Sequence, residues 1–291
     1  MQKSLISKIS LENREFLVKR DDLIDPYLAG NKYRKLYTLV QTPKENLKKI
    51  ISYGGTQSNA MLAIAALCHK KEWQFVYYTK SVSQTQKEQK KGNYYNALAL
   101  GMEHIELDEI LYRDFIASLS ITLDKDSFIV DQGGAVKEAK IGLEVLANEI
   151  RDDLRNDNSL SFNAIATPSG TGTTALFLAL AMPEFKVYTT PCVGDVKYLK
   201  EQMSALCPLP KNLCILEPKK KYHFAKPYEE FYTMYEKLLE SGIEFDLLYS
   251  PGMWLALLEQ TQENILYVHS GGVSGNESMK ERYFKKFKIA K

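Results

Sequence analysis

The sequence predicts an α/β protein whose sheets are mostly parallel. Short β-branched or apolar runs alternate with longer helical patterns along the chain, which is typical of βαβ units. At ~100–200 residues per domain, the 291 residues allow one large domain or two smaller ones. Four predicted strands end in glycine-rich loops. Because ligands bind at the carboxyl ends of parallel strands, the pattern indicates one site built from several loops.

Charge and hydropathy argue against several classes of protein. The 38 Lys and Arg against 36 Asp and Glu leave a net charge of +2, which argues against a nucleic-acid binder. The longest apolar runs, 60–68 and 175–182, have nine and eight residues. A membrane helix needs ~20 apolar residues, so no membrane span is expected. The N-terminus carries no signal-peptide segment and the four cysteines show no CxxC spacing, so we expect a cytoplasmic protein with reduced thiols.

In the first half of the chain, β-branched and aromatic runs predict strands and longer mixed stretches predict helices. A strand at 16–19 is expected to lead, through an acidic turn and Ala29-Gly30-Asn31, into a helix carrying Lys32 and Lys35. The polar segment 81–92 is expected to be a solvated loop and the start of a helix. Further strands are predicted at 49–53, 75–78, 104–107 and 128–130, with helices at 58–70, 93–100 and 137–154.

The second half continues the alternation. A helix at 174–182 follows a Gly/Thr-rich turn, and the basic segment 280–291 is expected to be a solvated terminal helix. Trp73 and Trp254 are expected to be packing residues. Strands are predicted at 164–167, 186–189, 213–216, 245–248 and 265–268.

The glycine-rich loops follow four of these strands. One such loop alone indicates a tight turn, but four at the same structural position would surround one crevice with backbone N–H groups and small hydroxyls. They lie at 54–59, 132–134, 169–174 and 270–272.

The loop at 169–174 has the composition of an anion site. Its glycines let several N–H groups point to one place, and the following helix adds its partial positive charge. The loop has neither the GK[ST] of a Walker A motif nor the GxGxxG spacing of a dinucleotide site, so it suits a small phosphate monoester. The alternative is a capped helix with nothing bound. The residues concerned are Ser169, Gly170, Thr171, Gly172 and Thr173.

Lys32 lies in the first turn of its predicted helix, where a lysine does not complement the helix dipole. A desolvated lysine that faces a cluster of N–H groups is typical of a Schiff-base nucleophile. The alternative is a solvated surface lysine. None of the four histidines pairs with another at i, i+4, so the sequence gives no support for a metal site.

Taken together, the motifs resemble the 1-aminocyclopropane-1-carboxylate deaminase / D-cysteine desulfhydrase family of pyridoxal-phosphate enzymes, which have the tryptophan-synthase-β type of fold (fold type II). The resemblance covers nearly the whole chain, and GNKxRKL together with GGxxSN is its most specific part. The matching segments are VKRDDL, AGNKYRKL, ISYGGTQSNA, VDQGGAVKEAKIG, IATPSGTGTTA, FDLLYSPGM and YVHSGG.

The resemblance implies a cofactor, pyridoxal 5'-phosphate, and a role for each matching residue. Lys32 would bond covalently to the cofactor and shuttle protons, and Lys35 would reach its phosphate beside the loop 169–174. Asn59 would hydrogen-bond the pyridine 3-hydroxyl. Ser58 and Tyr249 would lie by the substrate, and Ser250 would sit at the pyridine nitrogen.

Ser250 has a mechanistic consequence within the resemblance. The deaminases carry an acid at this position and the desulfhydrases a hydroxyl. A hydroxyl can donate to an unprotonated nitrogen, which would make the ring a weaker electron sink and favour direct β-elimination. The expected reaction is therefore β-elimination from D-cysteine, with ring opening of the cyclopropane acid as the alternative.

The sequence also departs from the family pattern. Ala60 stands where the family has His or Gln to hold the substrate carboxylate, which leaves a non-catalytic pyridoxal-phosphate-binding protein as a second alternative. An expected tyrosine aligns with either Tyr222 or Phe224. The role of His269, which precedes the last glycine loop, stays open.

The resemblance further implies two domains with the cofactor in the cleft between them. Residues 1–46 plus 151–291 are expected to form the larger domain and residues 47–150 the smaller one. The expected partner is a small amino-acid substrate, without nucleic acid or membrane, in a protein that forms a homodimer.

Overall fold

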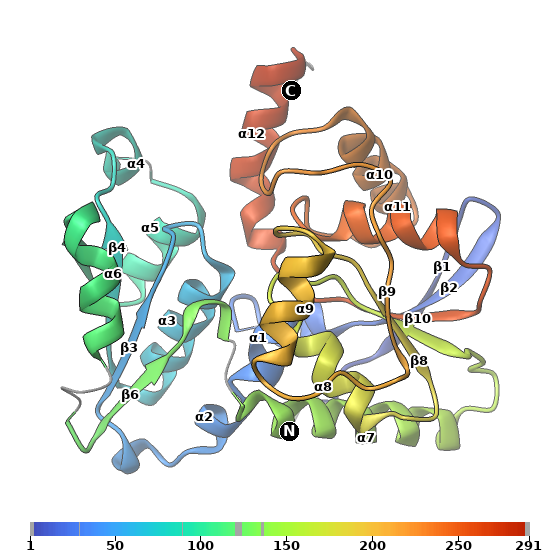
Figure 1. Cartoon of the computed structure of the whole chain (residues 1–291), viewed down its shortest axis with the longest axis horizontal. Coiled ribbons are helices and arrows are strands. Elements are labelled where there is room, and N and C mark those ends of the chain that lie inside the picture. Colours follow the sequence, from blue (N-terminus) through green and yellow to red (C-terminus); the bar gives the residue numbers. More distant parts are fainter. Residues whose placement is uncertain (1–2, 29, 89, 120–123, 135–136, 289–291) are drawn as a thin grey trace.

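The computed structural model describes residues 3–288 apart from 29, 89, 120–123 and 135–136, and it confirms the α/β class (Figure 1). Two separate sheets each carry helices on their faces. The strands are β1 (Ile6–Leu11), β2 (Arg14–Lys19), β3 (Lys49–Tyr53), β4 (Gln74–Lys80), β5 (Met102–Leu107), β6 (Ser127–Val130), β7 (Ala164–Ala166), β8 (Lys186–Thr189), β9 (Leu213–Ile215) and β10 (Ile265–Val268).

The smaller sheet has the strand order β5-β4-β3-β6, and every pairing in it is parallel. Its helices occupy the left part of Figure 1. They are α3 (Asn59–Lys71), α4 (Gln84–Glu88), α5 (Gly92–Ala99) and α6 (Glu109–Ser118).

The larger sheet has the order β1-β2-β10-β7-β8-β9, with parallel pairings except for the β1–β2 hairpin. The hairpin was not predicted. It turns at Glu12 and Asn13, which both have positive φ, as two-residue hairpin turns require. The remaining helices are α1 (Gly30–Lys35), α2 (Tyr37–Gln41), α7 (Ala139–Asn156), α8 (Thr173–Ala181), α9 (Val196–Ser204), α10 (Glu229–Glu240), α11 (Ser250–Gln260) and α12 (Asn276–Phe287).

Each sheet has one point where its strand order reverses. In the smaller sheet this point lies between β3 and β6, and in the larger sheet between β7 and β10. Loops on either side of such a point diverge and leave a crevice for ligand. The four predicted glycine-rich loops follow these four strands, so the topology gives all of them the position that suits ligand binding.

The helices that follow two of these loops are buried almost completely. All residues from Ala60 to Cys68 in α3 and from Thr173 to Ala179 in α8 are buried. A helix that is apolar all round belongs in a core, which agrees with the long apolar runs of the sequence. The amino ends of α3 and α8 therefore lie inside the molecule. No helix of the described residues combines the length and the apolar character needed to cross a bilayer.

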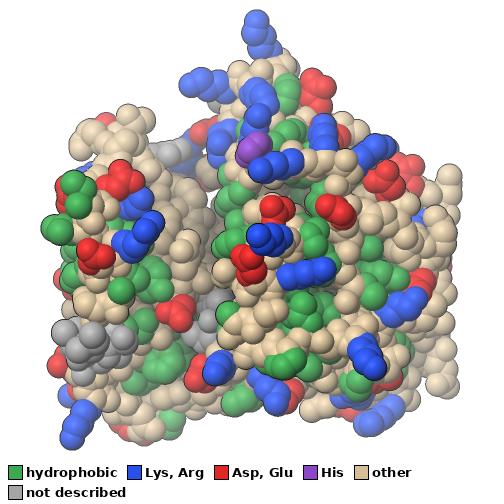
Figure 2. All heavy atoms as spheres, in the orientation of Figure 1, with side chains coloured by type: hydrophobic (Ala, Val, Ile, Leu, Met, Phe, Trp, Pro, Cys, Tyr) green, Lys and Arg blue, Asp and Glu red, His purple; other side chains and the backbone are tan. Residues whose placement is uncertain are grey.

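Two sequence predictions are wrong in this structure. Residues 245–248 form a turn and no strand, because the Asp246 carboxylate accepts the backbone N–H groups of Leu248 and Tyr249 at 3.0 and 2.6 Å. The terminal helix is not simply solvated: α12 begins earlier, at Asn276, and buries Met279 and Tyr283, while its basic residues face outward (Figure 2). Residues 289–291 of the predicted helix lie outside the described part of the chain.

The expected boundary at residue 150 falls inside α7. Leu143, Leu146 and Ile150 of this helix pack with Leu176 and Leu178 of α8 in the core beneath the larger sheet. We therefore propose a boundary before α7, with the smaller domain ending after β6. The surface is hollowed where the two parts meet (Figure 2).

A buried ion network anchors α1 at this junction. The Arg34 guanidinium donates to both oxygens of Asp21, at 2.8 and 2.9 Å, and to both oxygens of Glu149, at 2.7 and 2.9 Å. Ser4 adds a hydroxyl that donates to Asp21 at 2.6 Å. Arg34 and Asp21 are fully buried, and the two carboxylates hold the pKa of Arg34 above its ordinary value against desolvation. The network ties α1 to the end of β2 and to α7.

We expect Arg34→Met to lower the free energy of unfolding by ~3–5 kcal/mol, because it leaves the buried Asp21 without a cation and Glu149 with only Lys19, at 3.9 Å. Chemical denaturation measures the effect. Arg155→Met is the matched control, since Arg155 makes only an exposed i, i+3 pair with Asp152, and its midpoint should stay unchanged. Equal midpoints for the two variants would contradict the anchoring role.

Candidate active site

Lys32 is placed by a close contact between α1 and the last glycine loop. Gly30 has a φ of +58°, and a Cβ at this position would lie 2.1 Å from the Ser270 carbonyl oxygen. The same carbonyl accepts the N–H of Asn31 at 3.2 Å. Only glycine fits this approach, which explains the Gly30-Asn31-Lys32 order. Ala29, the remaining residue of the predicted turn, lies outside the described residues.

The Lys32 side chain lines a cavity between the two parts of the molecule, together with Asn59, Asp22 and the loop 270–274. Its Nζ donates to Asn31 Oδ1 at 3.0 Å. Burial lowers the pKa of Lys32 to about 8, and the negative charge of Asp246 opposes this shift. The neutral amine that a nucleophilic lysine requires is therefore more abundant near neutral pH than it is for an ordinary lysine.

Lys35 is a second buried ammonium group in the same region. It is 5% exposed, and its Nζ donates to the Gly133 carbonyl at 3.2 Å. Burial and the nearby charge of Lys32 place its pKa well below the ordinary value. Neither lysine forms an ion pair with a carboxylate within the described residues. An anionic ligand bound beside them would favour the ammonium form of both lysines.

The loop 169–174 supplies the neighbouring donors. Gly172 has a φ of +78° and begins α8, and the Thr171 and Thr173 hydroxyls lie 3.0 Å apart. The Thr174 hydroxyl is buried and has no hydrogen-bond partner within the described chain. Such an unsatisfied hydroxyl at a helix N-terminus fits a phosphate group.

Ser169 differs from its neighbours. The Thr189 hydroxyl donates to the Thr167 carbonyl at 2.8 Å, so the 2.6 Å contact between Ser169 and Thr189 must use the Ser169 proton. The Ser169 side chain thus fastens the loop to β8 and has no proton left for a ligand. The phosphate role inferred from the resemblance is better suited to Thr171, Thr173 and Thr174.

Ser58 and Asn59 begin α3 at the carboxyl end of β3. Ser58 caps the helix and accepts the N–H of Met61 at 3.3 Å. Asn59 Oδ1 accepts from Asn93 at 2.7 Å, and its amide nitrogen lies where a Cβ on Gly272 would come within 2.6 Å. Asn59 therefore contacts the last glycine loop across the junction. Ala60, which follows, is buried and brings no polar group.

Tyr249 and Ser250 begin α11 on the opposite side. Tyr249 lies against the loop 169–174, since a Cβ on Gly170 would be 3.4 Å from the Tyr249 ring. Burial and the charge of Asp246 raise the pKa of Tyr249, so the phenol stays protonated. Ser250 is fully buried and donates to Asp246 at 2.6 Å.

Seven of the eleven predicted site residues belong to a closed chain of neighbours. Ser58, Ser169 and Gly172 adjoin members of this chain in sequence, and the Thr173 hydroxyl lies 3.0 Å from that of Thr171. In order, the contacts or electrostatic couplings join Lys32, Asn59, Gly272, Asp246, Ser250, Tyr249, Gly170, Thr171, Gly133 and Lys35, which returns to Lys32. The closed chain of neighbours has cationic, N–H and hydroxyl donors at one end and Asn59 with Ser250 at the other, which fits a phosphorylated pyridine.

His269 supports the last glycine loop of the site through hydrogen bonds to backbone groups. Its Nδ1 accepts the N–H of Gly271 at 3.1 Å and its Nε2 lies 2.9 Å from the Glu244 carbonyl, so the hydrogen bonds assign the proton to Nε2. The imidazole ring of His269 stacks on the Phe245 ring, with the two centroids 4.5 Å apart. Both nitrogens are used by backbone groups, so His269 holds the loop and has no free nitrogen for a ligand.

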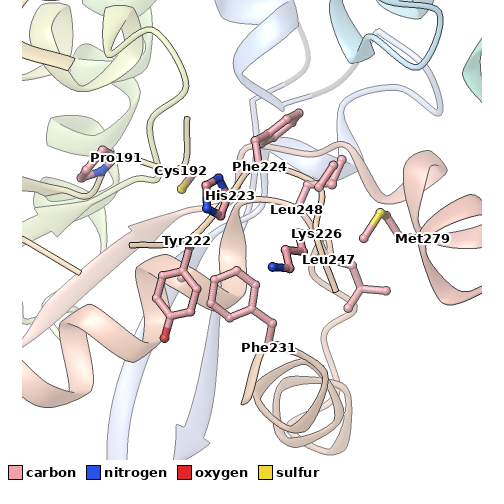
Figure 3. Close-up of a pocket in the computed structure, with 12 residues that line it drawn as sticks. Pro191, Cys192, Tyr222, His223, Phe224, Lys226, Phe231, Leu247, Leu248 and Met279 are labelled. Carbon is pink, nitrogen blue, oxygen red and sulfur yellow. The ribbon is translucent and has the colours of Figure 1, made fainter. Parts of the chain in front are cut away.

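Figure 3 shows a second, mostly apolar pocket, lined in part by Tyr222 and Phe224. Phe224 lies at its edge and packs on the Tyr249 ring with centroids 5.4 Å apart, whereas the Tyr222 hydroxyl donates to Glu230. Of the two candidates for the expected tyrosine, Phe224, which has no hydroxyl, is the one that packs on Tyr249.

Two contributors were not singled out from the sequence. Asp246 supports Tyr249 and Ser250, and Arg34 fixes the helix that carries both lysines. An aspartate four residues before a helix-starting Ser-Pro is a recognisable capping signal. Arg34 belongs to the GNKxRKL motif, but no local pattern shows what it binds, because its partners lie 13 and 115 residues away.

We expect Lys32 in the cofactor-free protein to react with an acylating reagent at a rate that rises with pH and is half-maximal near pH 8, since only the neutral amine reacts. Asp246→Asn should move this midpoint to lower pH, because the negative charge that favours the ammonium is lost. Mass spectrometry of the modified peptide measures both. Lys48 is the control, as Asp126 holds its pKa above the ordinary value. A Lys32 midpoint near 10.5 would contradict the burial argument.

No family model matches the chain. Two curated proteins match most of it. A Thermotoga maritima protein provisionally named 1-aminocyclopropane-1-carboxylate deaminase is 27% identical over 288 residues, covering 89% of this chain and 88% of that protein. A D-cysteine desulfhydrase of Serratia proteamaculans is 25% identical over 289 residues, covering 89% and 87%.

Solved structures agree on the fold. The crystal structure of a homologue of the deaminase superposes with a TM-score of 0.72 at 20% identity, covering 97% of this chain and 94% of that one. A hydrogen sulfide-producing enzyme of Fusobacterium nucleatum gives 0.67 at 13% identity, covering 100% and 91%. The family and its fold type II neighbours depend on pyridoxal 5'-phosphate.

The resemblance inferred from the motifs is thus confirmed over about 89% of the chain. This protein is a homologue of the 1-aminocyclopropane-1-carboxylate deaminases and D-cysteine desulfhydrases, with the fold of the type II pyridoxal-phosphate enzymes.

Proposed function

We propose that this chain is a pyridoxal-phosphate-dependent lyase that converts D-cysteine and water to pyruvate, sulfide and ammonia. The observation that carries the proposal is the closed chain of neighbours around Lys32, in which a partly buried lysine with a lowered pKa lies among donors suited to a phosphorylated pyridine.

Each part of this site would have one task. Thr171, Thr173, Thr174 and the first N–H groups of α8 would hold the phosphate with Lys35. Asn59 would orient the ring through its 3-hydroxyl. When bound, the cofactor supplies an electron sink for the negative charge that develops at the substrate Cα.

The protein groups nearest the substrate would then handle protons. Lys32, released when the substrate amine takes its place, would remove the proton from Cα. Ser58, at the start of α3, and Tyr249, held beside Gly170, would contact the substrate from opposite sides. The Tyr249 phenol, kept protonated by burial, could donate to the departing sulfur.

Two features favour elimination from D-cysteine. Position 250 carries a hydroxyl, as it does in the desulfhydrases, and the wall beside Tyr249 is the apolar ring of Phe224. Ala60 leaves the substrate carboxylate without one side-chain donor, and a hydrogen bond to a charged group contributes ~1.5–3 kcal/mol. We therefore expect a high KM.

Ring opening of 1-aminocyclopropane-1-carboxylate is the second candidate. It is favoured by one observation, the buried Asp246 carboxylate 2.6 Å behind Ser250, which brings an acid close to the position where the deaminases have one. A non-catalytic cofactor-binding role is favoured only by Ala60.

A substrate panel tests the proposal. Purified protein loaded with cofactor is given D-cysteine, L-cysteine and the cyclopropane acid, and pyruvate, sulfide and 2-oxobutanoate are measured. We expect pyruvate and sulfide from D-cysteine, and a loss of at least ~10²–10⁴-fold in Lys32→Ala, the range for a positioned acid–base group. Lys48→Ala, an exposed control, should keep the full rate.

Efficient 2-oxobutanoate release without D-cysteine turnover would favour the deaminase. Bound cofactor with no turnover of any substrate would favour the non-catalytic role. Retention of the rate in Lys32→Ala would show that the nucleophile is another residue.

A further inference from the structure

The start of α11 contains a buried hydrogen-bond network centred on Asp246, which is 1% exposed. One carboxylate oxygen accepts the N–H groups of Leu248 and Tyr249 at 3.0 and 2.6 Å. The other accepts the Ser250 hydroxyl at 2.6 Å. Asp246 thus receives three donors from the segment that carries Tyr249 and Ser250.

The direction of the bond between Ser250 and Asp246 decides what Ser250 can offer to a ligand. A serine hydroxyl has one proton and two lone pairs. The Ser250 hydroxyl donates its proton in a hydrogen bond to Asp246, and one lone pair accepts a hydrogen bond from the Tyr267 hydroxyl at 3.3 Å. One lone pair and no proton remain. In this arrangement Ser250 can accept a further hydrogen bond but cannot donate one.

Three accepted hydrogen bonds favour an ionised Asp246. Desolvation raises the pKa of Asp246 above its ordinary value, and the Ser250 hydroxyl and the backbone N–H groups of Tyr249 and Leu248 oppose that shift. The negative charge of Asp246 also raises the pKa of Lys32, which opposes the effect of desolvation. Accepting three hydrogen bonds and donating none is the arrangement of a carboxylate, which has acceptor oxygens only.

We propose that Asp246 is a positioning residue that makes Ser250 a hydrogen-bond acceptor for the pyridine nitrogen of the bound cofactor. The inference rests on the proposed function. Accepting from the nitrogen requires a protonated ring, so Ser250 and Asp246 together would do what a single carboxylate does elsewhere. This direction is the reverse of the one expected from the sequence, where Ser250 donates to an unprotonated nitrogen and weakens the electron sink.

The decisive measurement is the ¹⁵N chemical shift of cofactor labelled at the ring nitrogen and bound to the protein without substrate. We expect the wild type to show a pyridinium signal at neutral pH. Asp246→Asn should move it to the pyridine position: the amide oxygen can still accept from Leu248 and Tyr249, but the amide nitrogen now donates to Ser250 and frees the hydroxyl proton. A pyridine signal in the wild type would overturn the proposal.

Two further variants separate this role from a merely structural one. Tyr267→Phe removes the other donor to Ser250 and leaves its bond to Asp246, so the pyridinium signal should persist. Ser250→Ala removes the acceptor and should move the signal toward pyridine, which keeps the test decisive if Asp246→Asn does not fold. An unchanged signal in Ser250→Ala would contradict the role of this pair.

A cofactor-free arm keeps the inference distinct from the proposed function. In protein labelled with ¹³C at its aspartate carboxyl groups, the resonance lost in Asp246→Asn should be that of an ionised carboxylate at neutral pH. A protonated Asp246 would overturn the inference. A protein that takes up no pyridoxal phosphate would overturn the proposed function instead, and the carboxyl resonance would still decide the direction of the Ser250–Asp246 bond.

Discussion

The position of Lys32 depends on the buried bidentate bonds that Arg34 makes with Asp21 and Glu149. Helix α1 has only six residues, too few to be stable alone. Arg34 fastens it to the end of β2 and to α7. Gly142 of α7 lets the helices meet, since a Cβ there would lie 1.8 Å from the Arg34 carbonyl oxygen. Lys32 and Lys35 flank Arg34, so the same anchor aims both lysines.

The anchor explains how the protein can hold two ammonium groups in a poorly solvated site. Lys32 and Lys35 have lowered pKa values because burial disfavours their charge. A loosely held segment would move these side chains into solvent. Here the backbone is held by Arg34 on one side and by the Ser270 carbonyl on the other, so the site stays electropositive and ready for an anion. The buried Thr174 hydroxyl, which has no hydrogen-bond partner within the described residues, could likewise bond to the anion.

Opposite the lysines, Asp246 organises the start of α11. Its carboxylate accepts the backbone N–H of Tyr249, which makes a turn of the preceding chain, and it accepts a hydrogen bond from the Ser250 hydroxyl. The two backbone hydrogen bonds explain why residues 245–248 form a turn where a strand was predicted. The third fixes the direction of the Ser250 hydroxyl, the group that would meet the cofactor. Local backbone structure and site chemistry therefore have one physical cause at this position.

Sequence alone determined the α/β class, most strands and the four glycine-rich loops, because β-branched runs, helical periodicity and glycine after a strand are local signals. The residues of the site were also named from sequence, through motifs such as GNKYRKL and GGTQSN. Local patterns could not place β1 or exclude a strand at 245–248, since the first depends on pairing with β2 and the second on an aspartate side chain.

Tertiary structure decided which hydroxyls of the phosphate loop are free, which aromatic residue faces Tyr249, and which way the Ser250 proton points. Each of these depends on a partner distant in sequence: Thr189 for Ser169, Phe224 for Tyr249, and Tyr267 with Asp246 for Ser250. A residue type shows what a side chain can donate or accept, but only its neighbours in space determine which of its protons and lone pairs are already used.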